Sequence, residues 1–247
     1  MAIKTLLNYS PNFNSKKRKS KEIKFIIFHY TGMQKESAAI NKLTNIQSEV
    51  SCHYLIKNNG EIIKVVPDLF TAWHAGKSSW KNYKSLNQNS IGIEIINPGH
   101  EFGYKKFSKK QIFTLLKLGK FLIKKYKISS ENILGHSDIA PQRKKDPGEK
   151  FPWEYFSKKG IGVWHTLKKQ ELIKNRRLKT SKIEKEFFFN NLFKIGYSKK
   201  TSKDLNKDRY IRDVAKAFQR RFRQELINGK IDRECLLISE NLLKGHY

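Results

Sequence analysis

The near-continuous apolar stretch at residues 24–31 places the strongest constraint on how this chain can fold. It reads Lys-Phe-Ile-Ile-Phe-His-Tyr-Thr, with no alternation of polar and apolar side chains before the histidine. Strands of this kind are covered on both faces, whereas an alternating strand leaves one face in water. The stretch therefore predicts a buried strand that ends at His29.

Residues 90–96, Ser-Ile-Gly-Ile-Glu-Ile-Ile, predict a second strand with a carboxylate in the middle of an apolar run. Burying a carboxylate is costly unless it is paired, protonated or directed into a site. Glu94 therefore either faces a functional site or lies on an edge strand in water. His29 has two interpretations as well, because it can belong to a site at the end of its strand or be a hydrogen-bonded core residue.

The segments around these strands predict further regular structure. Residues 34–47 have helical periodicity. Residues 52–66 contain two strand-like runs separated by Asn59-Gly60, which is the usual signal of a tight hairpin. A capping-box pattern at residues 108–111 opens a helix whose apolar stripe continues to residue 126.

Residues 67–90 are expected to form a long loop. Long loops in compact domains are often functional, and this one contains Trp73 and His74. We therefore expect the loop to line a cleft.

The charge of the chain is extreme. Its 247 residues include 51 lysines and arginines against 22 aspartates and glutamates, which gives a formal net charge of +29. Such a field attracts polyanions, including nucleic acid, anionic lipid and acidic wall polymers. The lysines are dispersed among many asparagines and isoleucines, so a bias toward AT-rich codons explains the charge equally well. No basic-aromatic recognition motif supports a specific nucleic-acid-binding protein.

Composition divides the chain into four parts. Residues 1–21 are expected to form a flexible basic arm, residues 22–173 the main domain, and residues 174–182 a polar linker. Residues 183–247 are expected to form a small helical unit, with three amphipathic segments at about residues 183–195, 208–226 and 231–244.

The cysteines and the N-terminal residues do not indicate the cellular compartment of the protein. Cys52 and Cys235 fall in different parts of this division, so a disulfide is not expected. The first residues lack the apolar run of a secretory leader, and no stretch is long and apolar enough to span a membrane.

Residues 135–148, Gly-His-Ser-Asp-Ile-Ala-Pro-Gln-Arg-Lys-Lys-Asp-Pro-Gly, concentrate candidate metal ligands in one irregular segment. His136, Asp138 and Asp146 all have suitable side chains. Zinc in hydrolases usually takes three protein ligands from histidine, cysteine or carboxylate and keeps a fourth position for water. His29, His136 and Asp146 complete such a set only if the fold brings the first strand beside this segment.

Two further residues suit the chemistry of such a site. Glu94 can take a proton from a metal-activated water, and Lys144 can stabilise the oxyanion that forms when water attacks a carbonyl. The residues alone leave the ligand set open, because five other histidines compete: His53, His74, His100, His165 and His246.

Five motifs occur in order along residues 22–160. They are Phe-His-Tyr-Thr at 28–31, Ser-Cys-His-Tyr-Leu-Ile at 51–56, Ala-Trp-His-Ala-Gly at 72–76, Ser-Ile-Gly-Ile-Glu at 90–94 and the segment 135–148. Together they resemble the type 2 N-acetylmuramoyl-L-alanine amidases, zinc enzymes that are related to peptidoglycan recognition proteins. The resemblance implies a mixed α/β fold in which helices flank a central sheet with a zinc cleft. A small C-terminal three-helix domain follows it.

The resemblance also implies roles for individual residues. His29, His136 and Asp146 match the zinc ligands of the family, Glu94 matches the general base, and Lys144 matches the group that stabilises the transition state. Asp138 is then left as a residue that stabilises its loop.

Other positions are assigned with alternatives. Trp73 and His74 are expected to bind substrate, and a structural role for their loop is an equal alternative. Cys52 occupies a position where some relatives have a catalytic tyrosine, so this chain is expected to depend on Glu94. Residues 195–197 and 217–223 resemble part of a three-helix peptidoglycan-binding domain.

The implied activity is hydrolysis, with Zn²⁺ as cofactor, of the amide between N-acetylmuramic acid, ordinary or 1,6-anhydro, and L-alanine of a stem peptide. The alternative is a non-catalytic muropeptide-recognition protein, which the complete ligand set disfavours. The expected partner is peptidoglycan or its fragments, and the chain is expected to be a monomer. A wall-binding domain favours the cell envelope or secretion, whereas the missing leader favours cytoplasmic muropeptide recycling.

Overall fold

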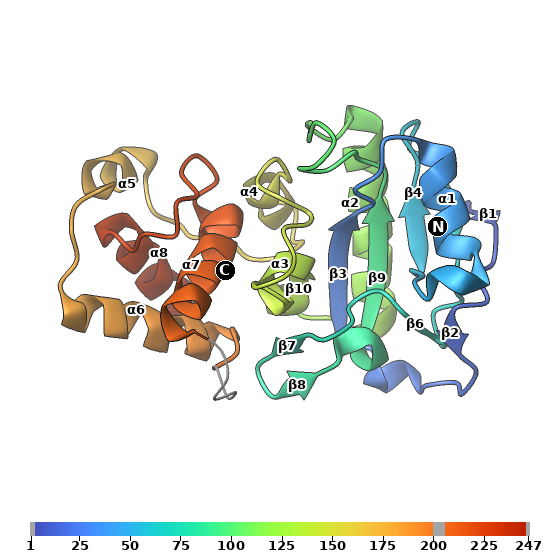
Figure 1. Cartoon of the computed structure of the whole chain (residues 1–247), viewed down its shortest axis with the longest axis horizontal. Helices are drawn as coiled ribbons and strands as arrows, with labels where there is room; N and C mark the ends of the chain where they lie inside the picture. Colours follow the sequence, from blue (N-terminus) through green and yellow to red (C-terminus); the bar gives the residue numbers. More distant parts are fainter. Residues whose placement is uncertain (1–2, 200–205, 246–247) are drawn as a thin grey trace.

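A six-stranded mixed sheet forms the centre of the larger unit in a computed structural model, which describes residues 3–199 and 206–245 (Figure 1). The two strands with apolar runs, β3 (Phe25–Tyr30) and β9 (Ser90–Ile95), lie side by side in its interior and pair in parallel. Phe25 to Phe28 are each at most 1% exposed. The prediction of a buried strand at residues 24–31 is confirmed.

Four shorter strands extend this sheet in the order β1-β5-β4-β9-β3-β10. They are β1 (Leu6–Leu7), β4 (Tyr54–Ile56), β5 (Ile62–Lys64) and β10 (Ile133–Gly135). β4 and β5 pair antiparallel, and Gly60 between them has a φ of 87°, so the predicted hairpin is confirmed. Two small ladders lie outside the sheet: β2 (Phe13–Asn14) with β6 (Thr71–Ala72), and β7 (Ser79–Trp80) with β8 (Tyr83–Lys84).

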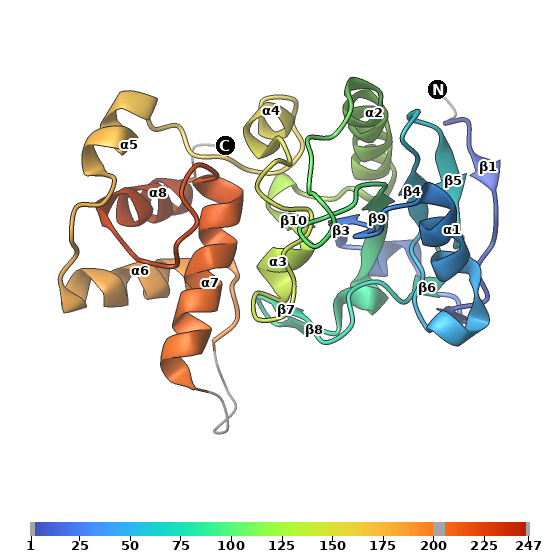
Figure 2. The same cartoon turned by 45° about the horizontal axis from the view of Figure 1, so that its top comes forward.

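Helices cover the sheet on both faces (Figure 2). The longest is α2 (Lys109–Tyr126), where the Ser108 hydroxyl accepts a hydrogen bond from the backbone of Gln111, which confirms the capping box. The predicted helix at residues 34–47 is α1 (Glu36–Thr44). Shorter helices are η1 (Ser20–Glu22), η2 (Ile46–Ser48), η3 (Leu86–Asn89), η4 (Ser130–Asn132), α3 (His136–Ile139) and α4 (Trp153–Ser157).

The C-terminal unit is helical and lies beside the end of the sheet at β10 (Figure 1). The helix α5 (Lys169–Asn175) begins in the segment expected to belong to the main domain, ends in the expected linker and contacts α8. The helices of the C-terminal unit that follow it are α6 (Lys182–Ile195), α7 (Lys207–Phe222) and α8 (Arg233–Leu243). The last three confirm the predicted amphipathic segments. One hydrophobic cluster contains Leu134 of the sheet together with Val214 and Phe218 of α7, so the two units share a core. Within the described residues, no helix combines the length and hydropathy needed to cross a bilayer.

The N-terminal arm differs from the sequence expectation, because its described part packs against the larger unit. β1 pairs with β5, and Arg18 is 8% exposed. The Arg18 guanidinium donates to the backbone carbonyls of Asp68, Asn87 and Gln88. Its planar set of N–H donors satisfies several carbonyls at once, which a pattern of like charges in sequence does not reveal.

The segment expected to be a polar linker also packs. Arg176 donates to both carboxylate oxygens of Glu234 at 2.8 and 2.7 Å. The Thr180 hydroxyl donates to the carbonyl of Ile231 at 2.7 Å. Residues 174–182 are therefore held against the start of α8, because their polar side chains meet complementary groups on it.

A buried aspartate links several elements of the larger unit. Asp68 is 4% exposed and accepts hydrogen bonds from Tyr54, Tyr126 and Lys125 at 2.6, 2.6 and 2.8 Å. Burial alone raises the pKa of Asp68, but the hydrogen bonds outweigh burial and hold this pKa well below its ordinary value. The ionised carboxylate is thus the form that stabilises the fold.

Replacement of Asp68 by asparagine is expected to lower the free energy of unfolding at pH 7 by about 3 kcal/mol. A carboxyl whose pKa is depressed in the folded state contributes stability above its unfolded pKa and loses that contribution as the pH falls toward its folded pKa. The difference between the two proteins should therefore be constant from pH 7 to about 5 and shrink below about pH 4. Urea unfolding across this range measures it, and a constant difference down to pH 2.5 would contradict the assignment.

Candidate functional site

The fold brings three predicted site residues to the carboxyl ends of adjacent strands. His29 on β3 is directly opposite Glu94 on β9. Gly135 of β10 is opposite Phe28, so His136, the next residue along the chain, lies beside His29. The carboxyl ends of parallel strands are the usual place for sites in such sheets. The predicted proximity of the first strand and residues 135–148 is therefore present.

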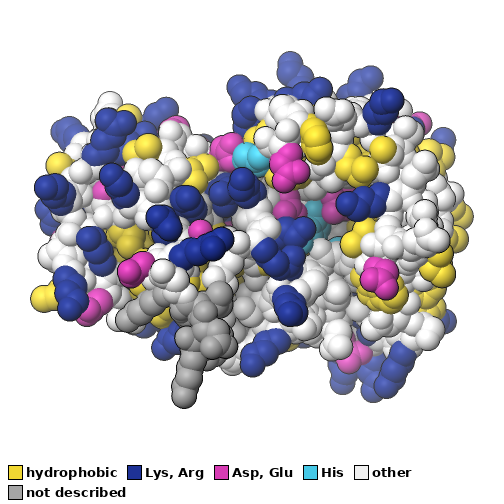
Figure 3. Space-filling view, in the orientation of Figure 1, with side chains coloured by type: hydrophobic (Ala, Val, Ile, Leu, Met, Phe, Trp, Pro, Cys, Tyr) yellow, Lys and Arg dark blue, Asp and Glu magenta, His cyan; other side chains and the backbone are white. Residues whose placement is uncertain are grey.

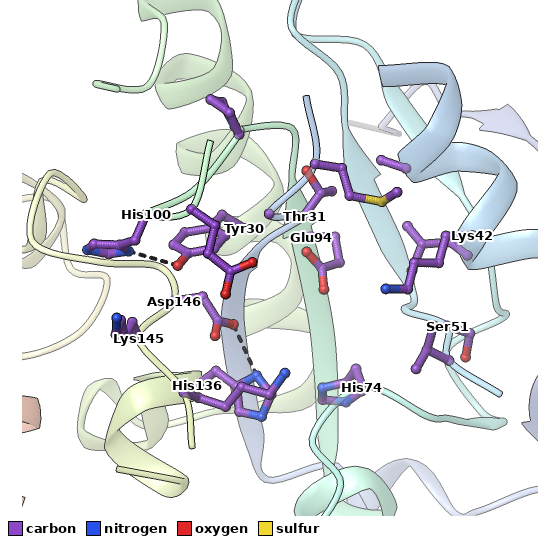
Figure 4. Close-up of a pocket in the computed structure, with 18 of the residues that line it drawn as sticks. Tyr30, Thr31, Lys42, Ser51, His74, Glu94, His100, His136, Lys145 and Asp146 are labelled. Atoms are coloured by element: carbon purple, nitrogen blue, oxygen red, sulfur yellow. Dashed lines mark hydrogen bonds and ion pairs between the residues drawn. The ribbon is translucent and has the colours of Figure 1, made fainter. Parts of the chain in front are cut away.

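His29, His136 and Asp146 form a triangle of potential metal ligands (Figure 4). The Nδ1 atoms of the two histidines are 2.9 Å apart, and each lies 3.0 Å from Oδ2 of Asp146. The residues are 1%, 3% and 6% exposed. Three electron-pair donors that converge in a buried place suit a bound cation.

The protonation states of this triangle also suit a cation. Burial, together with the nearby His136, lowers the pKa of His29 to about 4, so its imidazole is neutral at pH 7. Burial raises the pKa of Asp146, but the two histidines outweigh that effect and hold the pKa far below its ordinary value. A neutral imidazole and an ionised carboxylate are the forms that bind metals.

A chain of hydrogen bonds orients the ring of His29. The Ser90 hydroxyl donates to the carbonyl of Leu86 at 2.6 Å, which leaves its oxygen to accept from Nε2 of His74 at 3.1 Å. Nδ1 of His74 then accepts from Nε2 of His29 at 3.0 Å. Placing the proton of His29 on Nε2 leaves a lone pair on Nδ1, which faces the triangle.

Gly92 allows this arrangement because the ring of His74 lies directly over it. A Cβ atom at Gly92 would be 2.4 Å from the nearest ring carbon of His74. Any larger residue would displace the ring. The close packing of His74 thus explains the glycine in the Ser-Ile-Gly-Ile-Glu motif. The geometry of His74 suits a role in positioning His29. The sequence-based assignment of His74 to substrate binding stays a prediction, although the ring does line the cleft.

Glu94 has the environment of a general base. Burial and the charge of Asp146 raise the pKa of Glu94 to about 8, whereas the Lys144 ammonium lowers it. Among the described residues, none forms a hydrogen bond with its buried Oε2 atom. With this pKa, Glu94 is mainly protonated at pH 7 in the metal-free protein, and a cation held by the neighbouring ligands would lower the pKa and favour the carboxylate form that accepts a proton. Cys52 is fully buried in a hydrophobic cluster of the larger unit.

A cleft of about 310 Å³ opens over these residues. Trp73 lines it, as expected for the loop at residues 67–90, and Lys144 lines it as well. The Trp73 indole donates to Asn14 at 2.7 Å, so the N-terminal arm helps to shape the cleft wall. Figure 3 shows the hollow with histidine and acidic side chains inside it and many lysines and arginines around it.

The competing histidines have other partners or lie elsewhere. The rings of His53 and His74 are hydrogen-bonded within the fold. His100 contacts the Tyr30 hydroxyl and Glu149 at 2.8 and 3.0 Å. His165 is outside the cluster of ligands among the described residues, and His246 lies outside the described residues.

Asp138 connects the loop that contains His136 to the C-terminal unit. Its carboxylate accepts hydrogen bonds from the Gly135 amide at 2.8 Å, Arg221 at 2.6 Å and the Tyr197 hydroxyl at 2.9 Å. The Arg221 guanidinium is 2% exposed and stacks on Trp153 at 4.3 Å. Asp138 is therefore occupied in holding the loop, in agreement with the role that the sequence leaves to it.

Arg221 and Tyr197 were not identified from sequence. A signal existed for Arg221, because it follows Val214 and Phe218 at helical spacing and so falls on the apolar face of α7. An arginine on such a face needs a buried acceptor. Nothing in the sequence identified Asp138 as that acceptor.

Substitution of Arg221 by methionine is expected to weaken metal binding by about 10- to 100-fold, because Asp138 loses its charged partner and the loop of His136 loosens. Competition with a chromogenic chelator measures the affinity. Arg212, exposed on the same helix, offers the matched control Arg212→Met, which should keep the wild-type affinity. Loss of thermal stability with unchanged metal affinity would show that Arg221 supports only the core.

Comparisons with known proteins agree with this geometry. Residues 19–149 match the family described as N-acetylmuramoyl-L-alanine amidase (Amidase_2). The chain is 36% identical over 236 residues to N-acetylmuramoyl-L-alanine amidase AmiD of Escherichia coli K12, covering 91% of this chain and 83% of that protein. It is 32% identical to 1,6-anhydro-N-acetylmuramyl-L-alanine amidase AmpD of Haemophilus influenzae, covering 60% of this chain and 87% of that protein.

Solved structures extend the similarity to the whole fold. The E. coli AmiD structure, a complex with anhydro-N-acetylmuramic acid-L-Ala-D-gamma-Glu-L-Lys, superposes with a TM-score of 0.78 and covers 91% of this chain and 90% of that chain. AmpDh3 from Pseudomonas aeruginosa superposes with a TM-score of 0.79 at 28% identity, covering 96% and 97%. Both matches include most of the C-terminal helical unit, since each covers more than nine tenths of this chain.

Proposed function

The chain belongs to the N-acetylmuramoyl-L-alanine amidase family and is an amidase of that type, and we propose that it acts as a zinc hydrolase on muropeptides. The bond that it cleaves joins the lactyl group of N-acetylmuramic acid to the L-alanine of a stem peptide. The observation that carries the proposal is the buried triangle of His29, His136 and Asp146 with Glu94 beside it, whose Oε2 has no hydrogen-bond partner in the described part of the chain.

Zinc fits this donor set, because two imidazoles and a carboxylate are typical of zinc in hydrolases. His29 and His136 would hold the ion through Nδ1, and Asp146 through Oδ2, since these are the atoms that converge. When bound, the ion supplies a Lewis acid that lowers the pKa of a water and polarises the carbonyl. His74 and Ser90 keep the His29 ring oriented through the hydrogen bonds described above.

Glu94 is proposed to take the proton of the attacking water and deliver it to the amine of L-alanine as the amide breaks. Its position on the strand next to His29 places it at the same end of the sheet as the ligands. Lys144 is proposed to stabilise the oxyanion. It lines the cleft, and it lies close enough to His29 and Glu94 for its ammonium to lower the pKa of both.

Trp73 and His74 are proposed to border the substrate. Trp73 has an aromatic face on the cleft wall, and such faces suit the apolar side of a sugar. AmiD was solved with an anhydro-muropeptide, and AmpD is named for activity on the 1,6-anhydro form. We extend that substrate form to this chain.

The proposed division of the chain keeps a catalytic part at residues 22–173 and a helical part at residues 183–247. The helical part is proposed to contact peptidoglycan, and its likeness to a wall-binding domain favours action in the cell envelope. The helical part also has a structural role, because Tyr197 and Arg221 donate hydrogen bonds to the Asp138 carboxylate.

Product analysis tests the proposal. The purified enzyme with zinc should release free stem peptide, beginning with L-alanine, from anhydro-muropeptide, as seen by mass spectrometry. The same preparation incubated with intact sacculi shows whether wall polymer is also a substrate. If neither material yields a peptide with a free L-alanine amine, the proposed reaction is wrong.

A further inference from the structure

A second pocket, of about 420 Å³, lies between the loop that contains Asp146 and helix α7 of the C-terminal unit. Residues 143–145 and Glu149 line one side, and Asp213, Lys216 and Arg220 of α7 line the other. Figure 3 shows lysine and arginine side chains gathered where the two units meet. We call this the interdomain pocket.

The interdomain pocket adjoins the catalytic cleft. His100, Arg143, Lys144 and Lys145 line both spaces. A long ligand in the cleft that extends past Lys144 would approach the interdomain pocket.

Arg220 distinguishes this pocket from the general basic surface of the chain. It is only 7% exposed, and its Nε has no hydrogen-bond partner among the described residues. The nearest carboxylate oxygen, Oε2 of Glu149, is 4.0 Å away and already contacts His100 at 3.0 Å. A mostly buried arginine whose Nε has no close acceptor among the described residues is unfavourable on its own, so the site is suited to receive an anion.

The rigidity of α7 supports such a role. The residue after Arg220 is Arg221, whose buried ion pair with Asp138 fixes the helix against the catalytic loop. The backbone that carries Arg220 is therefore fixed relative to the catalytic loop, and burial of the Arg220 side chain restricts its conformations, which lowers the entropy lost on binding.

The chemistry of the proposed substrate indicates which part enters the pocket. The anhydro-sugar with its lactyl amide is uncharged, so every negative charge of the muropeptide lies on the peptide side. A γ-linked glutamate keeps its α-carboxylate free, and the peptide ends in another carboxylate. Lys42 and Ser51 lie on the side of the cleft away from Lys145 (Figure 4), and the apolar and aromatic residues Leu43, Val50 and Trp73 also line the cleft.

We propose that the interdomain pocket is a subsite for a free carboxylate of the stem peptide and that Arg220 is its specificity-determining residue. The sugar then lies toward Trp73, and the peptide extends toward α7. The inference rests on the proposed function, and it assigns the C-terminal unit a direct part in substrate selection.

The test compares the full-length zinc enzyme and its Arg220→Gln variant on three substrates. The first is anhydro-N-acetylmuramoyl-L-Ala-γ-D-Glu-L-Lys, and the others have either the glutamate α-carboxylate or the terminal carboxylate converted to an amide. In the wild type, one of the two amidations should lower kcat/KM by about 10- to 100-fold, mainly through KM. In Arg220→Gln, the free acid should be as poor as that amide, so the discrimination disappears.

Matched variants separate a binding role from a folding role. Arg233→Gln removes a guanidinium from the same unit outside the pocket and should discriminate as the wild type does. Arg220→Lys keeps a charge and should restore part of the preference. If Arg220→Gln does not fold, Lys216→Gln should reduce the preference instead.

Two results would overturn the inference. If the wild type hydrolyses all three substrates equally well, the pocket is not a carboxylate subsite, and the proposed amidase function is unaffected. If folded Arg220→Gln still prefers the free acid to the amide as strongly as the wild type does, the carboxylate binds elsewhere. Absence of peptide release from every substrate would overturn the proposed function as well.

Discussion

Replacement of Glu94 by glutamine is expected to lower kcat by at least about 100-fold while zinc binding persists, because the variant loses the group that moves the proton but keeps all three ligands. Glutamine has the same shape and cannot accept that proton. Turnover of an anhydro-muropeptide and the metal content of the same sample measure the two properties. The metal-free variant should be at least as stable as the wild type, since burial opposes ionisation of Glu94.

Glu101 provides the matched control, because it is an exposed carboxylate that lines the same cleft. Glu101→Gln should retain close to the wild-type kcat. Peptide release at the wild-type rate by Glu94→Gln would remove Glu94 from the mechanism, and a large loss in Glu101→Gln would indicate that the base is at the mouth of the cleft.

Substitution of Asp146 by asparagine is expected to weaken zinc binding by more than the 10- to 100-fold that changes around metal ligands typically cause. The amide is neutral, so the two histidines lose the negative charge that balances the cation. Activity should fall in proportion to bound zinc, and excess zinc should restore part of it. Calorimetric titration and turnover at several zinc concentrations measure both effects.

Asp68→Asn is the control for Asp146→Asn, since Asp68 is equally buried but lies outside the catalytic cleft. It should lose stability and keep its zinc. Full zinc affinity in folded Asp146→Asn would show that the ion is held without this carboxylate.

Much of the catalytic geometry followed from local patterns. The apolar runs at residues 24–31 and 90–96 predicted two strands, the first of them buried, and parallel pairing in the interior of the sheet then placed His29 opposite Glu94. The turn at Asn59-Gly60 predicted the hairpin. These patterns work because they report burial and turn geometry over a few residues.

Contacts between distant segments could not be predicted in the same way. The lysine-rich arm was expected to be flexible. Arg18 of this arm instead donates to backbone carbonyls of Asp68 and Asn87, which lie close together only in the folded chain. The expected linker packs on α8 because Arg176 donates to Glu234, a residue that is distant in sequence. The link from Arg221 to Asp138 joins residues from separate units, so neither local pattern contains it. Long-range polar pairs depend on the completed fold.

The most direct test of the account is diffraction from zinc-loaded crystals at the zinc absorption edge. The expected result is one anomalous peak at about 2.0–2.2 Å from Nδ1 of His29, Nδ1 of His136 and Oδ2 of Asp146. The peak should be absent in crystals of a His29→Ala variant. A peak bonded to other residues, or full occupancy without His29, would show that this triangle does not hold the catalytic ion.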